Sequence, residues 1–316
     1  RSPSRGLGDV YKRQGQLGDG TTTNRTTPVQ IEASGVVSLA DSSYSYVTRY
    51  VKSDGSAWAV GSSQYGQLGD GSVVDHNQSV QIVSSGVQTV SNGHRFGYIL
   101  LDTGELKGFG NRSFGRLGDG LPLAHDWTQV DIADGVRDFE MGALMSSFIK
   151  RDGQVLNVGH NANGGLGNGT KEITGKFVHL PNTNASKVAV SHYHSFYLDI
   201  NGSLWGTGKN DYGELGLGDN IDRNMSVMIE PSGVKDVSVG ANHTIFMKNN
   251  GSLWAMGANY NGQLGDGTNN NRNQPVQIES SGVVAITTGT WGSYYLKSDG
   301  SLWSMGYNEH GQLGIG

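Results

Sequence analysis

The chain has 316 residues, of which 50 are glycine and only six are proline, so it is neither collagen-like nor a proline-rich disordered tract. It contains no cysteine, which excludes disulfides and cysteine-ligated metals. No stretch approaches the ~18 consecutive apolar residues of a membrane helix, and the net charge of −5 lacks the basic footprint of a nucleic-acid-binding protein. We therefore expect neither membrane insertion nor nucleic acid as a partner.

The first 13 residues match nothing later in the chain. Residues 1–13 hold four basic residues and one acidic residue, and they resemble translated adapter sequence. We interpret them as a non-native leader and leave them out of the fold prediction. Without them the net charge changes from −5 to −8. Residues 14–316 are then expected to form a single repeat domain.

A set of hairpin glycines recurs at a strict interval of 49 residues. Its members are Gly55, Gly104, Gly153, Gly202, Gly251 and Gly300. In five of the six copies Asp or Asn precedes the glycine, which is the signal of a two-residue hairpin turn with positive φ. A further glycine follows six residues later, and then a Gly-x-Leu-Gly box such as Gly262–Gly265.

Within each copy the pattern predicts four short strands. In copy six we expect strands over 275–278, 283–289, 294–297 and 301–305, with turns at Ser281-Gly282 and Asp299-Gly300. Four strands in about 40–50 residues are typical of a propeller blade. We therefore predict an all-β fold, a β-propeller of six 49-residue, four-stranded repeats. A parallel β-helix is the structural alternative, although its repeats are usually shorter.

The end of each copy resembles the repeat of the regulator of chromosome condensation family. The segment Gly300-Ser-Leu-Trp-Ser-Met-Gly-Tyr-Asn-Glu-His-Gly-Gln-Leu-Gly314 shows the likeness, and residues 251–265 repeat it nearly word for word. The resemblance covers residues 14–316 and implies a propeller, usually with seven blades. Only six copies are present, so either the ring closes with six blades or it is incomplete, and a fragment of a longer protein is one reading.

A tryptophan position precedes the second glycine of each copy. It holds Trp58, Trp205, Trp254 and Trp303, with Lys107 and Leu156 in copies two and three. We expect these tryptophans, like the hairpin glycines, to be structural and to pack between neighbouring blades. Lysine cannot fill such a site by packing alone, so copy two is expected to be looser.

Two polar patterns invite a metal interpretation. The Asp after each box, as in Asp70 and Asp266, lacks the second carboxylate of a calcium loop and predicts an Asx turn instead. His192 and His194 would share one face of a strand, but no third zinc ligand is apparent, and the family resemblance implies a structural histidine at His194. No nucleophile elbow, phosphate loop or acid–base pair is present. We predict no metal, no cofactor and no enzyme activity.

The copies differ most in the loops that follow Ser91, Gly142, Ser191, Gly240 and Gly289. The candidate binding residues are Arg95, Phe96, Met145, Tyr193 and Trp291, with Tyr44 and Tyr46 in the expanded first copy. In a ring these loops gather at one end, and aromatic, Met and Arg side chains are what binding hot spots use. Packing under neighbouring loops is the alternative for each residue. We predict a non-catalytic scaffold that binds another protein, extracellular or on the surface of a bacterium, with its oligomeric state open.

Two other functions stay open as alternatives. Guanine-nucleotide exchange on a small GTPase follows from the family resemblance, but it uses an inserted wedge for which the 49-residue spacing leaves no room. Glycan binding by a secreted propeller is compatible with the aromatic loops. Light sensing through clustered surface tryptophans is disfavoured, because only Trp291 lies in a variable loop.

Overall fold

The computed structural model describes residues 15–40, 46–93, 95–120, 126–181 and 183–314. The leader prediction for residues 1–13 and the prediction for Tyr44 lie outside these residues. Strands and turns make up the described part, with one 3₁₀ turn at Ser113–Gly115. None of its helical segments could cross a membrane. Two compact units, residues 1–136 and 137–316, are described separately below.

The first unit contains two four-stranded antiparallel sheets. Sheet 1 consists of β1 (Val36–Leu39), β2 (Val47–Lys52), β3 (Ala57–Gly61) and β4 (His76–Val83). Sheet 2 consists of β5 (Val87–Asn92), β6 (Phe96–Leu101), β7 (Leu106–Gly110) and β8 (Asp126–Ala133). Strand β2 packs against β5, so the two sheets are neighbours.

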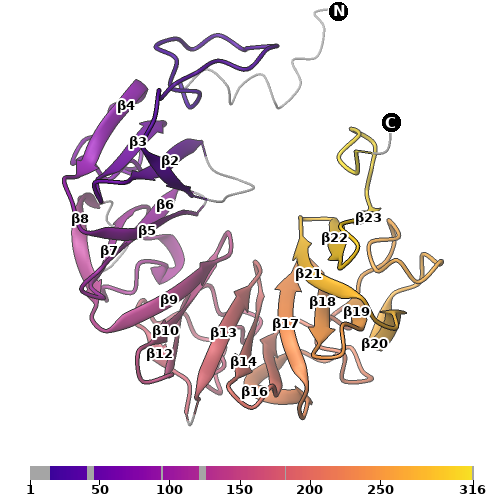
Figure 1. The fold of residues 1–316 in the computed structure, drawn as a ribbon. Coiled ribbons are helices and arrows are strands. Elements are labelled where there is room, and N and C mark those ends of the chain that lie inside the picture. Colours follow the sequence, from indigo (N-terminus) through magenta and orange to yellow (C-terminus); the bar gives the residue numbers. More distant parts are fainter. Residues whose placement is uncertain (1–14, 41–45, 94, 121–125, 182, 315–316) are drawn as a thin grey trace, which may run out of the picture. The chain divides into compact units, whose positions relative to one another are not determined.

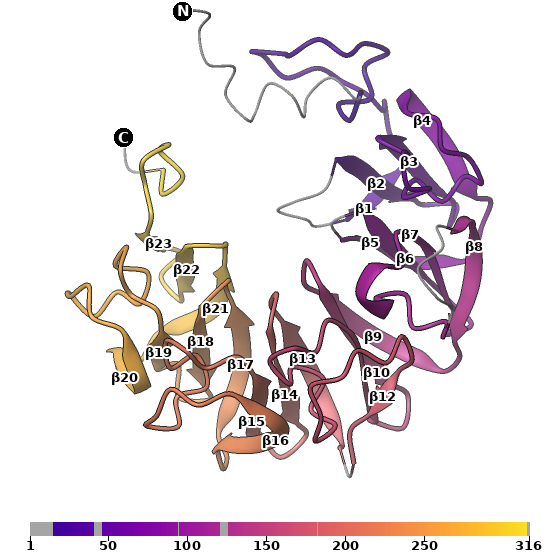
Figure 2. The same cartoon turned by 180° about the vertical axis from the view of Figure 1, so that it is seen from behind.

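The second unit contains four sheets that follow one another in chain order (Figures 1 and 2). Sheet 3 consists of β9 (Val136–Met141), β10 (Met145–Lys150), β11 (Val155–Gly159) and β12 (Val178–His179). Sheet 4 consists of β13 (Ala185–Val190), β14 (His194–Asp199), β15 (Leu204–Gly208) and β16 (Arg223–Glu230). Sheet 5 consists of β17 (Val234–Val239), β18 (His243–Lys248), β19 (Leu253–Gly257) and β20 (Arg272–Glu279). Sheet 6 consists of β21 (Val283–Thr288), β22 (Gly292–Lys297) and β23 (Leu302–Gly306).

The prediction that the four strands of one copy form one sheet is wrong for the outer strand. The strand expected to open copy six lies within β20, and it pairs with β19 of the preceding copy, with Trp254 opposite Gln277. The loop over 258–271 turns the chain back antiparallel to β19, whereas Ser281-Gly282 leads it away to the next sheet. A sheet therefore takes its fourth strand from the following copy, and sheet 6 has three strands in the part that the structure describes.

The six hairpins share one geometry, which differs from the predicted two-residue turn. In the first, Lys52 N donates to Ser56 O and Gly55 N donates to Lys52 O, both at 2.9 Å, so the loop has three residues. The glycine occupies the third position with a φ of 78°, in the left-handed region that glycine adopts without strain. The predicted positive φ is present at all six hairpin glycines.

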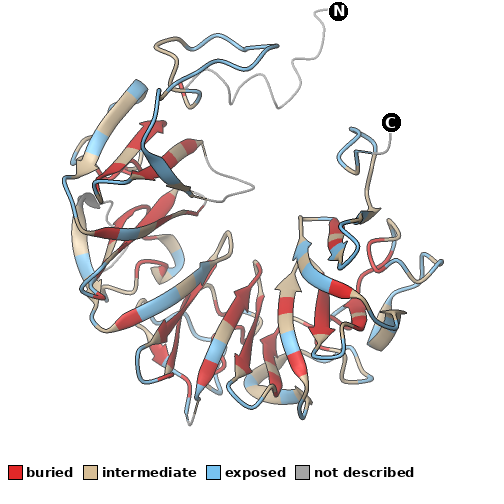
Figure 3. Ribbon diagram, viewed as in Figure 1, coloured by how far each residue is buried: buried red, intermediate tan, exposed pale blue. Residues whose placement is uncertain are grey.

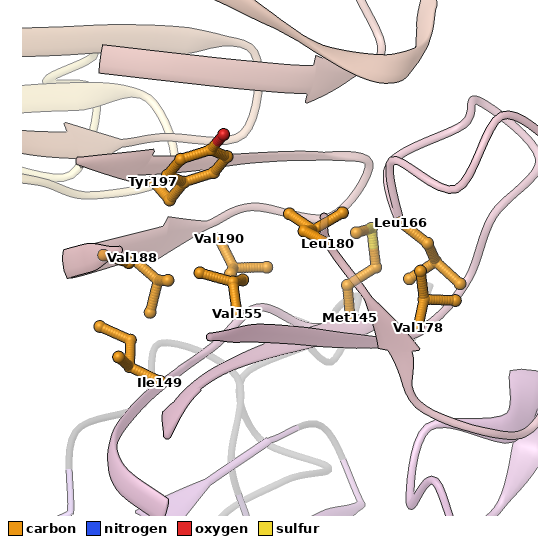
Figure 4. Close-up of a cluster of buried hydrophobic side chains, with 10 residues drawn as sticks. Met145, Ile149, Val155, Leu166, Val178, Leu180, Val188, Val190 and Tyr197 are labelled. Atoms are coloured by element: carbon orange, nitrogen blue, oxygen red, sulfur yellow. The ribbon is translucent and has the colours of Figure 1, made fainter. Parts of the chain in front are cut away.

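Four hydrophobic cores of the described residues lie between neighbouring sheets, and a smaller cluster lies within sheet 1 (Figure 3). The core between sheets 3 and 4 includes Met145, Val155 and Val188 (Figure 4). Met145 is 0 % exposed and Phe96 is 1 % exposed, so both predictions of an exposed binding side chain are wrong. Each residue opens the second strand of its sheet. The Met145 side chain belongs to the core between sheets 3 and 4, and the Phe96 ring is covered by the Arg116 guanidinium, 5.1 Å from the ring centroid.

Of the repeat tryptophans, Trp58, Trp205 and Trp254 are partly buried and Trp303 is exposed. Trp205 packs against the core between sheets 3 and 4, and Trp254 packs against the core between sheets 4 and 5. Each stacks on its cross-strand aromatic neighbour, as Trp254 does on Phe246 at 6.3 Å between ring centroids. In copy two, Lys107 stands opposite Asp131, and its Nζ lies 2.7 Å from the Asp131 carboxylate. An ion pair thus replaces the aromatic packing there.

Candidate interaction surface

Two sets of loops meet in the second unit. The first set joins the first and second strands of a sheet (residues 191–193, 240–242 and 289–291), and the second set follows the third strand (residues 160–163, 209–212, 258–261 and 307–310). Backbone bonds tie the two sets together within each sheet: Lys209 N donates to Tyr193 O at 3.0 Å, and Tyr307 N donates to Trp291 O at 3.0 Å. We call these seven loops the loop surface.

Glycine is required where the two sets of loops approach. Gly208 ends β15 with a φ of 105°, and a Cβ atom on it would lie 2.3 Å from Tyr193 O. Gly257 ends β19 in the same way, and its Cβ would lie 2.6 Å from Asn242 O. Any larger residue would force the loops apart. The second glycine of the repeat therefore positions the variable loops.

Contacts between neighbouring sheets make the loop surface continuous. Ala241 N donates to Thr290 O at 3.1 Å, which joins the loops of sheets 5 and 6. Lys209 Nζ donates to Asn242 Oδ1 at 3.0 Å, which joins the loops of sheets 4 and 5.

Lys209 has several other partners. Its Nζ lies 3.4 Å from Glu214 Oε1, 3.5 Å from Asp211 Oδ2 and 4.6 Å from the centroid of the Tyr212 ring. Glu214 is buried, and this burial raises the pKa of its carboxyl group. The lysine and the buried Glu214 therefore offset each other's charge.

Aromatic rings recur along the loop surface. His160 packs edge-on against Tyr193 at 5.3 Å between centroids, Tyr212 against Tyr260 at 6.1 Å, and Trp291 against Tyr307 at 5.5 Å. Tyr260 is 45 % exposed and Trp291 is 44 % exposed. The structure thus brings the predicted residues Tyr193 and Trp291 onto one chain of connected loops, beside three tyrosines that were not predicted.

The corresponding loops of the first unit hold the remaining predicted residues. Arg95 has a φ of 74°, its guanidinium lies 4.8 Å from the Tyr65 ring centroid, and its Nη1 donates to Tyr65 Oη at 3.2 Å. Tyr46 is half-buried, and its carbonyl accepts a bond from Ser62 N at 3.0 Å. Phe114, which was not predicted, is 40 % exposed on the loop after β7.

A pattern in the sequence could have found the missed residues. The loops between the second glycine and the box differ as much between copies as the loops used for the prediction. They hold Tyr65, Phe114, Tyr212, Tyr260 and Tyr307. The adjoining boxes are nearly constant, which makes this variation less apparent in the sequence.

The box aspartates adopt the expected Asx turns. Asp266 Oδ1 accepts from Thr268 N at 3.0 Å, and Asp70 Oδ1 accepts from Ser72 N at 3.0 Å. A second oxygen of Asp266 pairs with Arg272 Nε at 2.6 Å, and the resulting hydrogen bonds hold the pKa of Asp266 below its ordinary value despite its burial. These bonds tie each box to the start of the outer strand.

The two repeat histidines are buried. His243 Nε2 lies 2.9 Å from Ser293 Oγ, while neither ring nitrogen of His194 has a hydrogen-bond partner. Burial lowers the pKa of His194 to about 3 and that of His243 to about 4. Both rings are therefore neutral near pH 7. In the described part of the chain, no three His, Asp or Glu side chains converge as a metal site would require.

Family models match the centre of the second unit. Two models of the regulator of chromosome condensation (RCC1) repeat match, one at residues 185–214 and 234–263 and the other at residues 201–247 and 250–296. Residues 185–296 therefore carry RCC1 repeats, and the chain has the fold of an RCC1-repeat β-propeller. The predicted family and fold class are thereby confirmed. Comparison with curated proteins gives no significant match.

Solved structures share the propeller fold at low sequence identity. Human WBSCR16 is 22 % identical, with a TM-score of 0.75 over 90 % of this chain and 80 % of its own. Prp20p from Saccharomyces cerevisiae is 16 % identical, with a TM-score of 0.73 over 89 % of this chain and 74 % of its own. Yeast RCC1 (Prp20) in its complex with Kap60 is 17 % identical, with a TM-score of 0.72 over 89 % of this chain and 72 % of its own. An RCC1-type propeller is compatible with a role in protein interaction.

Proposed function

We propose that this RCC1-repeat propeller is a non-catalytic scaffold that binds another protein through the loop surface. The observation that supports it is the row of aromatic side chains on connected loops, with Tyr260 and Trp291 about half exposed. Rigid aromatic side chains provide contact area at a low cost in conformational entropy, and they dominate measured binding energies. Rigid sheets with variable loops are a common basis for recognition.

The solved relatives are consistent with a protein partner. The structure of Prp20p was reported with its binding properties to Gsp1p and histones, and yeast RCC1 was solved bound to Kap60. Gsp1p, histones and Kap60 are partners of the yeast protein. For this chain they support only the general class of partner.

Affinity capture with the immobilised propeller tests the proposal. We expect Tyr260→Ala/Trp291→Ala to lose a protein that the wild type captures, because the double variant removes the most exposed tyrosine and tryptophan rings of the loop surface. The matched control is Met225→Ala/Met228→Ala on β16, whose side chains are 61 % and 46 % exposed. A captured set that is unchanged in the loop variant, or lost equally in the control, would refute the proposal.

Guanine-nucleotide exchange stays the alternative function. The 49-residue spacing gives no insertion to act as a wedge, and this is why exchange ranks second. Release of a fluorescent guanine nucleotide from small GTPases measures it directly. Acceleration of release by the wild-type propeller would reverse the ranking. Binding to a glycan array that depends on Tyr260 and Trp291 would instead favour the glycan alternative.

A further inference from the structure

Rings on these loops already hold cations within the chain. The Arg95 guanidinium lies over Tyr65 at 4.8 Å, and Lys209 lies over Tyr212 at 4.6 Å. Arg116 lies over Phe114 at 5.5 Å in the same loop position of sheet 2. Attraction between a cation and the face of an aromatic ring is worth about 0.5–2 kcal/mol, depending on exposure. In three copies, therefore, the aromatic ring between the second glycine and the box packs against a cation.

The most exposed tyrosine and tryptophan of the loop surface lack such a partner. Within the described residues, no Lys or Arg lies over Tyr260 or Trp291. Each of the two rings packs against a tyrosine that has a carboxylate beside it. Asp211, with 60 % of its side chain exposed, adjoins Tyr212, which packs on Tyr260. Glu309 accepts a bond from the Tyr307 hydroxyl, and the Tyr307 ring packs on Trp291.

The exposed charge of the loop surface is therefore negative. Lys209 is largely covered, and the buried Glu214 offsets its charge. Asp211 and Glu309 remain exposed. Negative carboxylates beside open aromatic faces favour a positive group, because ring and carboxylate attract a cation together.

We propose that the loop surface recognises a basic segment of its protein partner, with Lys or Arg side chains over Tyr260 and Trp291 and beside Asp211 and Glu309. This inference rests on the proposed function and specifies the chemistry of the partner. Electrostatic complementarity of this kind determines specificity and association rate more than it determines affinity.

Selection from a random dodecapeptide library on the immobilised wild-type protein tests two claims, that the loop surface binds a protein segment and that this segment is basic. Peptides that also bind Tyr260→Ala/Trp291→Ala are removed by counter-selection. We expect the remaining peptides to be enriched in Lys or Arg. Enrichment of neutral or acidic peptides would overturn the basic-segment proposal and leave the proposed function standing. A selection that yields no peptide dependent on the loop surface would overturn both.

The charge requirement is then measured on the best basic peptide. Asp211→Asn/Glu309→Gln keeps the shape of both side chains and should weaken binding at least tenfold. Asp131→Asn/Glu172→Gln is the matched control, since it removes two exposed acids outside the loop surface. Replacing each Arg of the peptide by citrulline should weaken wild-type binding similarly. Equal affinity of the two double variants, or of the citrulline peptide, would contradict the proposal.

Discussion

Gly97 lies directly against the guanidinium of Arg49, so that a Cβ atom on Gly97 would lie 2.8 Å from Arg49 Nη1. Arg49 is 1 % exposed, and its position holds Tyr98, Phe196 or Ile245 in other copies. The position of Gly97 holds a hydroxyl residue elsewhere, and Ser195, Thr244 and Ser293 each donate to a carbonyl of the preceding box. Copy two lacks that hydroxyl, and its absence makes room for the arginine of copy one.

Restoring the hydroxyl should therefore destabilise the wild type. We expect Gly97→Ser to cost about 1–3 kcal/mol of unfolding free energy, because the added atoms overpack the interface between sheets 1 and 2. In the Arg49→Ile background the same change should cost at least 1 kcal/mol less. Urea unfolding of the four proteins measures this coupling. Additive costs would show that Arg49 and Gly97 are independent.

Acid should destabilise the fold through the buried histidines. Burial lowers the folded-state pKa of His194 to about 3 and of His243 to about 4, whereas an unfolded histidine has a pKa of about 6.5. Below pH 6.5 the unfolded chain binds more protons than the folded chain, so stability falls as pH decreases. Each histidine lowers the unfolding free energy by at most about 1.4 kcal/mol for each pH unit between pH 6 and 4.

Replacing one histidine should make the unfolding free energy fall less steeply as the pH decreases. Copy three has Met145 at the position of His194, so His194→Met introduces a residue that the repeat accommodates. Unfolding free energies measured from pH 7 to 4 should show a shallower fall for His194→Met. The exposed His310→Asn serves as the control and should follow the wild type. Parallel curves for His194→Met and the wild type would refute the assignment.

The box aspartate should stabilise mainly through its turn. Asp266 is only 3 % exposed and bonds Thr268 and Asn259 as well as Arg272. We expect Asp266→Ala to cost about 2 kcal/mol, because several buried hydrogen bonds are lost. Asp266→Asn keeps the turn, as Asn168 does in copy three, and should cost about half as much. Thermal or urea unfolding distinguishes the two, and equal losses would indicate that the ion pair dominates.

Copy two should gain stability from the residues of the other copies. Trp58 stands opposite Gln81 and Trp254 opposite Gln277, whereas Lys107 stands opposite Asp131. The exposed ion pair contributes little, so Lys107→Trp/Asp131→Gln should stabilise the protein by about 0.5–2 kcal/mol. Amide hydrogen exchange in β7 and β8 should slow in parallel. Unchanged or faster exchange would contradict the prediction that copy two is looser.

The repeat could be predicted from the sequence because its markers act locally. Glycine with positive φ, alternating strands and turn residues recur every 49 residues, and each depends on neighbours only a few positions away. The Asx turns of Asp70 and Asp266 were predictable for the same reason.

The binding residues were harder to predict because exposure depends on distant contacts. Phe96 and Met145 have the chemistry of binding residues, but both are buried, Phe96 beneath Arg116 and Met145 in the core between sheets 3 and 4. Tyr260 packs against Tyr212 of the preceding copy, a contact that the spacing within one copy does not reveal.

By itself, the sequence determined the all-β repeat, its period and the positions of its hairpins. Only the tertiary structure decided that β20 completes the sheet of the preceding copy, that Arg49 is buried against Gly97, and which aromatic rings share the loop surface. The physical reason is that turns are governed by the conformational preferences of adjacent residues. Strand partners and burial are governed by hydrogen bonds and packing between residues about 15 to 50 positions apart.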